Sequence, residues 1–334
     1  MDFIKQAWKG ILFCFFIAIP SWWAGQIFPI VGGPVFAMLI GMMVTFFNKN
    51  MDPFKLGMSF TSKKILQFAI VLLGFGMNLT DILSKGNQSL PIILTTISTS
   101  LLIAFILSKI LQIPENESTL VGVGSSICGA SAIAATAPIL GASDEEIAQS
   151  ISVVFLFNVF AVLVFPFLGH AFGLSDQGFA TFAGTAINDT SAVTAAATAW
   201  DEMHGSNILG DATVVKLTRT LAIIPLTLGL AFIRLKRNQT ADFNVSMKKI
   251  FPVFILFFLF SATMTTLFNL SPKTTDPLLA ISKFLIVMAM SAIGLNTNIV
   301  KLLKTGGKPI LMGFCCWIGI ASVCLGMQYV LECW

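Results

Sequence analysis

The chain has 334 residues, of which 56% are hydrophobic and only 11% are charged, and its mean hydropathy is +0.87. This composition excludes an ordinary soluble domain with a single core and is typical of a polytopic membrane protein. The net charge of +4 is modest and the basic residues lie in polar joints, so nucleic acid is not an expected partner.

Eleven apolar segments follow one another along the chain, with short polar joints between them. Apolar segments of roughly 20 residues predict membrane-spanning helices, and the short joints leave no room for a second, soluble domain. We therefore expect a single all-α transmembrane domain over residues 1–334. Its segments cover residues 11–28, 34–47, 65–79, 90–111, 119–140, 147–172, 179–200, 213–233, 250–270, 278–295 and 309–330.

Basic residues gather at the amino terminus and in three joints that alternate along the chain. The positive-inside rule assigns these places to the cytoplasm, so we expect a cytoplasmic amino terminus and a carboxyl terminus outside. The residues concerned are Lys5, Lys9, Lys49, Lys55, Lys63, Lys64, Arg234, Lys236, Arg237, Lys248, Lys249, Lys301, Lys304 and Lys308.

Two of the segments hold almost no bulky side chain in their middle. Residues 122–138 read GVGSSICGASAIAATAP, and the run GTAINDTSAVTAAA from Gly184 repeats the part that starts at Gly124, 60 residues earlier. Small residues permit unwound backbone whose N–H and C=O groups are free to bind a ligand. In a membrane such backbone occurs only inside the protein or beside a polar cavity, so we expect two broken helices at a transporter's substrate site. Two continuous, closely packed helices are the simpler alternative.

The direction of these two segments is open, because they are two apart in order and would run parallel as full spans. If each one instead enters the membrane and returns as a re-entrant hairpin, the charge bias is unchanged and the hairpins enter from opposite faces. We favour broken or hairpin elements, since Gly124, Gly129 and the pair Asn188-Asp189 lie mid-segment.

A second internal similarity predicts an inverted repeat. The runs GMNL and PIIL, which begin at Gly76 and Pro91, correspond to GLNT and PILM, which begin at Gly294 and Pro309, at a constant offset of 218 residues. They involve the third and tenth segments, which cross the membrane in opposite senses. Inverted repeats are common in secondary transporters.

Lys216 and Arg219 lie one helical turn apart at the start of the eighth segment. A basic group at bilayer depth costs about 3 kcal/mol on insertion scales, so both need a negative partner. We expect them to neutralise an anionic substrate; the alternatives are snorkelling to the outer interface or pairing with Asp189, Glu202 or Asp211. Free N–H groups at helix amino ends would complete the anion site. The candidate substrate-binding residues are Ser125, Ser126, Cys128, Gly129, Ser131, Asn188, Thr190, Ser191, Lys216 and Arg219.

Asp189 is the candidate ion-coupling residue, because a carboxylate in the membrane can bind Na⁺ or take up and release a proton. Asn158, the lone polar residue in VVFLFNVFAVLVF, is expected either to face this site or to bond to a neighbouring helix. Glu145 and Glu146 are expected to stabilise the start of a helix that Ser143 caps.

No catalytic or metal-binding pattern is evident in the sequence. His170 and His204 are far apart and close to joints, which argues against a paired metal site or a histidine proton relay. The six cysteines lack CxxC spacing and are expected to be small apolar fillers. Because Ser-His-Asp order, HExxH and P-loop patterns are absent, we expect no enzyme, no metal and no cofactor.

Three runs in this order, GSSICGASAIAATAP, GTAINDTSAV and VVKLTRT, resemble the bacterial sulfate exporter family of YeiH-like inner-membrane proteins, and the resemblance covers essentially the whole chain. It implies a secondary carrier in the bacterial cytoplasmic membrane. It also implies a fold distantly related to bile-acid transporters and sodium–proton antiporters, with broken crossing helices.

The expected function is therefore export of a small anion, sulfate or a related sulfur oxyanion or sulfonate, by alternating access. Na⁺ and H⁺ are the candidate coupling ions, the expected partners are the anion and the lipid bilayer, and a homodimer is left open. The main alternative is a Na⁺- or H⁺-coupled cation exchanger or organic-anion symporter of the same fold. An anion channel is a weaker alternative.

Overall fold

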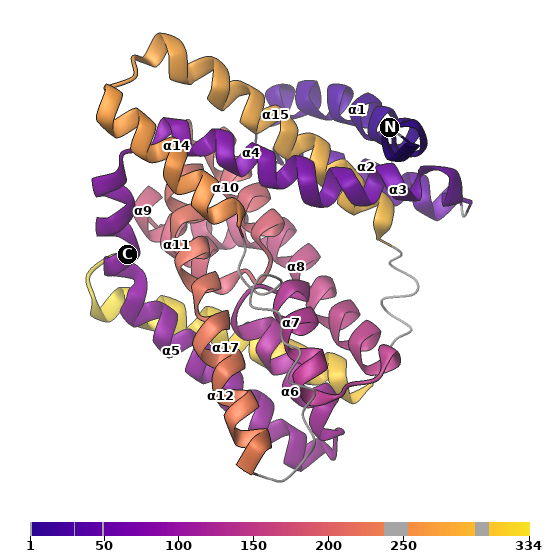
Figure 1. Ribbon diagram of the computed structural model, residues 1–334. Coiled ribbons are helices and arrows are strands. Elements are labelled where there is room, and N and C mark those ends of the chain that lie inside the picture. Colours follow the sequence, from indigo (N-terminus) through magenta and orange to yellow (C-terminus); the bar gives the residue numbers. More distant parts are fainter. Residues whose placement is uncertain (1, 30, 49, 237–252, 298–306) are drawn as a thin grey trace.

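The computed structural model describes residues 2–29, 31–48, 50–236, 253–297 and 307–334 (Figure 1), and all regular structure within these ranges is helical. The helices are α1 (Asp2–Ile27), α2 (Gly33–Phe47), α3 (Lys55–Phe60), α4 (Leu66–Leu73), α5 (Leu79–Leu111), α6 (Glu115–Ser126), α7 (Ala130–Leu140), α8 (Asp144–Ala171), α9 (Asp176–Ala186), α10 (Thr190–His204), α11 (Leu209–Leu221), α12 (Ile223–Lys236), α14 (Phe254–Phe268), α15 (Pro272–Asn296) and α17 (Lys308–Val330). A π-helical turn at Thr61–Ile65 joins α3 to α4, and 3₁₀ turns at Asp52–Phe54 and Gly74–Gly76 extend the same element at both ends.

Within the described residues, each predicted apolar segment coincides with a helix or with a pair of consecutive helices; residues 250–252 of the ninth segment lie outside them. Seven stretches within the described ranges are long and apolar enough to cross a membrane, and α2 and α14 are apolar helices of 15 residues each. The seven are Ala7–Ile27, Asp52–Gly76, Leu79–Leu111, Asp144–Ala171, Leu209–Arg234, Pro272–Asn296 and Lys308–Val330. The prediction of an all-helical polytopic membrane protein is confirmed.

The fifth segment folds back on itself as a hairpin of α6 and α7. Leu120 of α6 packs in one apolar cluster with Ala137 and Leu140 of α7. In a straight helix, Leu120 and Leu140 would lie about 30 Å apart, because each residue adds about 1.5 Å. The chain therefore reverses at residues 127–129, and the alternative of a continuous helix is wrong for this segment.

The seventh segment reverses in the same way, between α9 and α10. Near the open end of this hairpin the indole N–H of Trp200 donates to a carboxylate oxygen of Asp176 at 2.8 Å, and Phe179 stacks on Trp200 with ring centroids 4.1 Å apart. Helices α9 and α10 pack against α11, whereas α7 packs against α12, the second half of the same span. The two hairpins thus pack on different halves of the stretch Leu209–Arg234, and both segments are hairpins and not continuous helices.

The helices form two groups that we call the flanking bundle and the hairpin bundle. The flanking bundle consists of α1, α2, α3, α4, α14 and α15; the hairpin bundle consists of α5 to α12 and α17. Figure 1 shows the first group across the top of the molecule and most of the second below it. Helix α10 makes most of the contact between them, because it packs on both α2 and α15.

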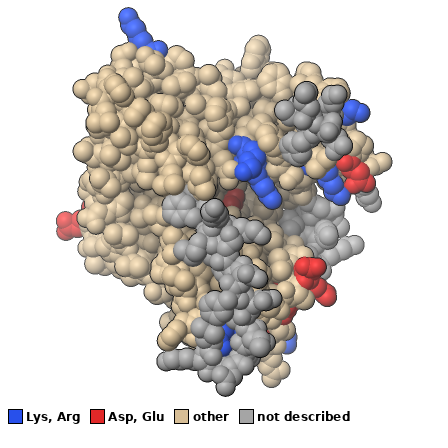
Figure 2. Space-filling model, in the orientation of Figure 1, with Lys and Arg blue, Asp and Glu red and all other residues tan. Residues whose placement is uncertain are grey.

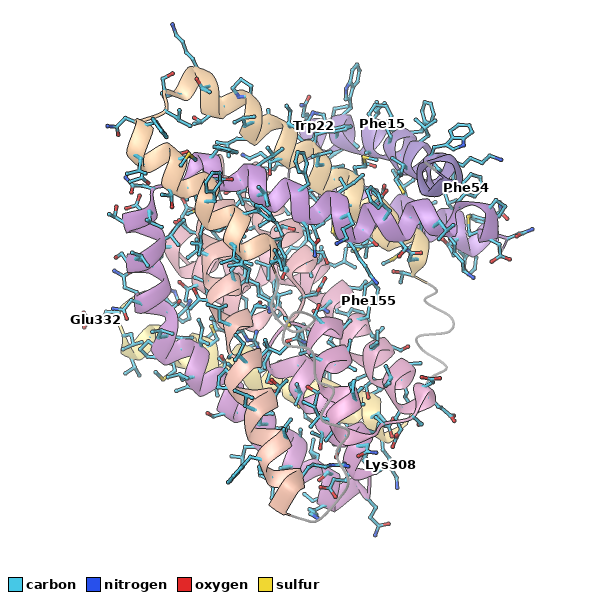
Figure 3. All side chains as sticks on the ribbon, viewed as in Figure 1. Phe15, Trp22, Phe54, Phe155, Lys308 and Glu332 are labelled. Atoms are coloured by element: carbon cyan, nitrogen blue, oxygen red, sulfur yellow. The ribbon has the colours of Figure 1, made fainter. Side chains whose placement is uncertain are left out.

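The segments related by the offset of 218 residues are antiparallel neighbours. Along α4 and α15, Gly76 lies beside Leu279, and the Ser282 hydroxyl donates to the Ala69 carbonyl oxygen at 2.6 Å. The start of α17 packs in one cluster with the end of α5. Figure 3 shows Lys308 and Glu332 at opposite ends of α17, which crosses the molecule. The expected opposite sense of these segments is confirmed.

The surface is largely apolar, as lipid contact requires. Figure 2 shows one face on which Lys, Arg, Asp and Glu are few and widely separated. Large side chains such as Phe16, Trp23 and Phe47 are exposed, and Figure 3 shows Phe15 on the outer side of α1.

That the termini lie on opposite faces of the membrane, with the basic joints on the side of the amino terminus, stays a prediction. Among the predicted basic residues, Lys5, Lys49, Lys236, Arg237, Lys248, Lys249, Lys301 and Lys304 lie outside the part of the chain whose side chains are described.

Candidate functional site

The tips of the two hairpins meet at Lys216, which is fully buried on α11. Its ammonium group donates to the carbonyl oxygen of Ile127, at the first tip, at 2.7 Å. It also donates to the carbonyl oxygen of Ile187, at the second tip, at 2.8 Å. One side chain therefore bonds both unwound segments.

Arg219, one turn further along α11 and equally buried, contacts the same tips. Its guanidinium donates to Ser126 O at 2.7 Å and to Ser125 O at 2.9 Å on the first hairpin, and to Thr185 O and Ile187 O on the second. These acceptors lie in the last turn of α6 and at the end of α9, where helix carbonyls lack partners within the helix and carry partial negative charge.

The two basic residues thus find their negative partners in the backbone. The alternative that Lys216 and Arg219 snorkel to the interface is wrong, because neither side chain is exposed. Pairing with Asp211 or Glu202 is also wrong: Asp211 forms an ion pair with Lys85, and Glu202 accepts a hydrogen bond from the Gly33 N–H at 2.9 Å. Whether Lys216 and Arg219 also contact a substrate stays a prediction.

The second halves of both hairpins begin at the same junction without a side-chain cap. The residues before α7 and α10, Gly129 and Asp189, make no side-chain cap hydrogen bond. By contrast Ser143, with Glu146, forms the predicted capping box of α8, and Ser175 caps α9. Two helix amino ends, with N–H groups that lack partners within the helix, therefore lie at the tips.

Asn158 of α8 supports the second tip. Its side-chain oxygen accepts hydrogen bonds from the backbone N–H groups of Asn188 and Asp189, each at 3.1 Å. Both expectations for this residue hold, since it bonds to a neighbouring segment and does so at the site. The side-chain oxygen of Asn188, by contrast, is buried and has no hydrogen-bond partner.

Asp189 is half-buried, and its carboxylate accepts a hydrogen bond from the Ser191 hydroxyl. It interacts electrostatically with Lys216 and with Cys128, and Cys128 interacts in turn with Arg219. With Lys216 and Arg219 protonated, Asp189 ionised and Cys128 as a thiol, this cluster carries a formal charge of +1. A buried net charge is costly without a counter-ion.

The other predicted residues contribute in different ways. Ser125 and Ser126 act through their carbonyl oxygens, and the Ser126 hydroxyl donates to Val123 O at 3.0 Å. Ser131 is exposed and Thr190 is half-buried, each in the first turn after a tip. Ile127, Thr185 and Ile187 were missed, because an apolar side chain or a helix-end carbonyl gives no signal in the sequence.

One expectation is overturned outside the tips. His170 and His204 were expected to lie apart, but His170 Nδ1 is 3.0 Å from His204 Nε2. The hairpin of α9 and α10 returns the chain to the end of α8, so residues 34 positions apart in sequence meet.

Comparison with known proteins identifies relatives along almost the whole chain. Residues 9–313 match the family described as conserved hypothetical protein 698. A UPF0324 membrane protein of Streptococcus mutans is 57% identical over 98% of both chains, and one of Streptococcus agalactiae is 56% identical over 99% of both. One of Fusobacterium nucleatum is 54% identical over 96% of this chain and 97% of its own. These names mention a membrane and no sulfate export. The chain is therefore a membrane protein that belongs to the UPF0324 family.

Proposed function

We propose that this protein is a secondary active transporter that carries a small anion by alternating access, with the binding site at the two hairpin tips. The observation that carries the proposal is the cluster of buried Lys216 and Arg219 with half-buried Asp189, whose formal charge is +1, beside two uncapped helix amino ends. Helix amino ends favour anions, because their N–H groups and dipole direct positive charge at the ligand.

The anion would lie between the starts of α7 and α10. The N–H groups of the first turns would donate to it, and Ser131 and Thr190 are placed in those turns. Lys216 has a third donor beyond its two carbonyl bonds and would add charge at short range. Arg219 would hold the tips in place while the anion binds.

Alternating access would move the hairpin bundle against the flanking bundle. The interface along α10 is made of small buried residues, among them Ala192, Ala195, Ala196 and Ala199. The Ala199 Cα lies only 2.9 Å from the position a Cβ at Gly32 would occupy. Smooth, closely packed faces of small residues suit two bodies that slide past each other, with no interlocking side chains to withdraw.

The resemblance to sulfate exporters supports the finer parts of the proposal. They are a sulfur oxyanion or sulfonate as cargo, export as the direction, the bacterial cytoplasmic membrane as the location and a cytoplasmic amino terminus. The basic residues at alternate joints support the same orientation.

A cation carrier of the same fold is the second candidate, and one observation favours it. The unpartnered oxygen of Asn188 and the carboxylate of Asp189 are acceptors that a Na⁺ ion could share. In that case Lys216 and Arg219 would only hold the tips, and Asp189 would bind the transported or coupling ion.

Ligand binding to the purified full chain in detergent separates the two candidates. Thermal unfolding is followed with sulfate, sulfite, thiosulfate, taurine, phosphate or chloride, each with Na⁺ and with K⁺, on wild type and on Asp189→Asn. Asp52→Asn is the matched control, since Asp52 is exposed far from the site. A ligand at one hundred times its dissociation constant stabilises the folded state by about 2.7 kcal/mol.

Under the anion proposal one oxyanion stabilises wild type in both salts. Asp189→Asn raises the site charge to +2, so that oxyanion binds the variant at least as tightly. If Na⁺ alone stabilises wild type and Asp189→Asn abolishes the effect, the cation reading replaces the anion reading. Absence of any anion effect, together with a Na⁺ effect that survives in the variant, would remove both sites from the tips.

A further inference from the structure

The histidine pair lies away from the hairpin tips, at the open end of the second hairpin. His170 is in the last turn of α8 and His204 in the last turn of α10, and both side chains are exposed. Their ring centroids are 5.2 Å apart, with 45° between the ring planes, and Nδ1 of the first faces Nε2 of the second at 3.0 Å. A mutual contact between two ring nitrogens needs one proton donor and one lone pair.

The surroundings of His204 decide which nitrogen keeps the lone pair. Nδ1 of His204 lies 3.2 Å from the carbonyl oxygen of Trp200, which can only accept, so Nδ1 carries the proton. In the neutral ring Nε2 then presents its lone pair to His170. A histidine that donates its other ring N–H to a backbone carbonyl is the usual arrangement of a metal ligand.

The ring of His204 is also held in a fixed orientation. It stacks on the indole of Trp200, with centroids 3.9 Å apart and 27° between planes. Trp200 is itself buried, stacks on Phe179 and donates its N–H to Asp176. The ring of His204 is therefore held in one orientation before any ion arrives, which lowers the entropy cost of binding.

The electrostatic environment favours a cation. Both rings stand at carboxyl ends of helices, where the free carbonyl groups carry partial negative charge. The nearest acidic groups in sequence are engaged elsewhere: Asp176 accepts from Trp200, Asp201 from the N–H groups of Ile208 and Leu209, and Glu202 from Gly33.

We propose that His170 and His204 form a two-histidine site for a divalent transition-metal ion such as Zn²⁺. Zinc binds imidazole nitrogen at about 2.0–2.1 Å, so two nitrogens 3.0 Å apart can bind one ion with an angle near 95°. For Nδ1 of a neutral His170 to bind the ion, its proton is lost to water while Nε2 of the same ring takes one up; an imidazolium ring releases the Nδ1 proton and keeps the one on Nε2. No cluster of three or more His, Cys, Asp or Glu side chains occurs within the described residues, so water would complete the coordination.

The bound ion would join the end of α8 to the end of α10. Since α10 packs on both α2 and α15 of the flanking bundle, the site would connect metal occupancy on this face to the position of the second hairpin. Imidazole ligands suit Zn²⁺, Cu²⁺ and Ni²⁺, whereas Mg²⁺ prefers oxygen ligands.

The test uses the purified full chain with Zn²⁺ alone as the probe, in a background where Cys315 and Cys333, the two cysteines that are not fully buried, are replaced by Ser. Calorimetric titration and thermal unfolding are compared for this background, His170→Gln and His204→Gln, with Mg²⁺ as the control ion. We expect one Zn²⁺ per chain, a rise in melting temperature, and an affinity at least tenfold lower in either variant. Lowering the pH to 5 should remove the effect, because protons compete for the imidazoles.

Both histidines are exposed, so without metal the two variants should have the same melting temperature as the background protein. This measurement separates a loss of metal binding from a loss of folding. Paramagnetic resonance of bound Cu²⁺ gives a second readout, with couplings from two imidazole nitrogens in the background and fewer in each variant. Equal Zn²⁺ binding in the background and in both variants, or no binding at all, would overturn the proposal. Neither result bears on anion transport, because only metal binding is measured.

Discussion

The two hairpins share a sequence pattern and the same two basic partners, yet they differ in how far they are enclosed. Every residue of α10 from Ser191 to Asp201 is buried between the bundles. Helix α7 instead keeps an exposed stripe of small residues that starts at the tip and follows one helical face: Ala130, Ser131, Ala134 and Pro138. The second hairpin is thus enclosed where the two bundles meet, whereas the first leaves an exposed path along α7, by which we expect a ligand to reach the tips.

Replacing Arg219 should have the largest effect on stability, because both hairpin tips lose hydrogen bonds at once. Arg219→Ala leaves buried carbonyl groups on both tips without a donor, and each such group costs about 1–3 kcal/mol. We expect a loss of about 4 kcal/mol or more in the free energy of unfolding, measured by denaturation in detergent.

The matched control is Arg234→Ala, which loses one hydrogen bond, from a half-buried guanidinium to Asn116. It should cost about 1 kcal/mol. Equal losses in Arg219→Ala and Arg234→Ala would mean that the tips do not depend on Arg219.

A change at Asn158 should separate the two hairpins, because its described hydrogen bonds go to the second tip alone. Asn158→Ala removes the acceptor of two buried N–H groups and should cost about 2–3 kcal/mol. Hydrogen exchange should accelerate at residues 187–189 and remain unchanged at residues 127–129. Similar acceleration at both tips would show that they open as one unit, and Asn116→Ala provides a control on the first hairpin.

A substitution at Gly129, in the first tip, should cause a smaller loss of stability. This residue has φ +68° and ψ −132°, a region that side chains strongly disfavour. Gly129→Ala should therefore cost about 2 kcal/mol. Gly141→Ala, at φ +62° and ψ +35° with open space around it, should cost about 1 kcal/mol. Thermal unfolding of the two variants side by side decides whether the reversal at the first tip requires glycine.

The difference in exposure between the two hairpins can be measured directly, with substitutions that should change stability little. In the Cys315→Ser, Cys333→Ser background, Ser131→Cys should react with a charged maleimide at least tenfold faster than Ser191→Cys. Ser131 is exposed, whereas Ser191 is only 3% exposed. If Ser131→Cys is as slow as Ser191→Cys, the stripe along α7 faces lipid and is not the aqueous route to the tips.

Much of the fold could be predicted from hydropathy, because each crossing helix needs its own apolar run. The eleven segments and the antiparallel third and tenth segments are of this kind. The hairpin form was only one of two alternatives, since a run of small residues fits a straight helix as well as a reversal. What decides it is a contact such as that between Asp176 and Trp200, 24 residues apart, which no local pattern encodes.

The charged residues of the candidate site could be predicted from the sequence, but the backbone carbonyl groups that bind them could not. Lys216 and Arg219 were recognisable because basic groups in an apolar segment need a partner. Their described partners are main-chain carbonyls, which every residue carries, so composition could not reveal them. The histidine pair was missed for a related reason: the reversal of the chain, and not the spacing, brings the rings together.

The hydrogen bonds from Lys216 to both tips also affect whether water and ions can leak through the protein. A water-filled path between the tips would require breaking buried hydrogen bonds to a charged group, each worth about 1.5–3 kcal/mol. These hydrogen bonds therefore hold the two hairpin tips against each other. If the protein carries an anion as proposed, the same bonds would limit the leakage of uncoupled ions past the tips.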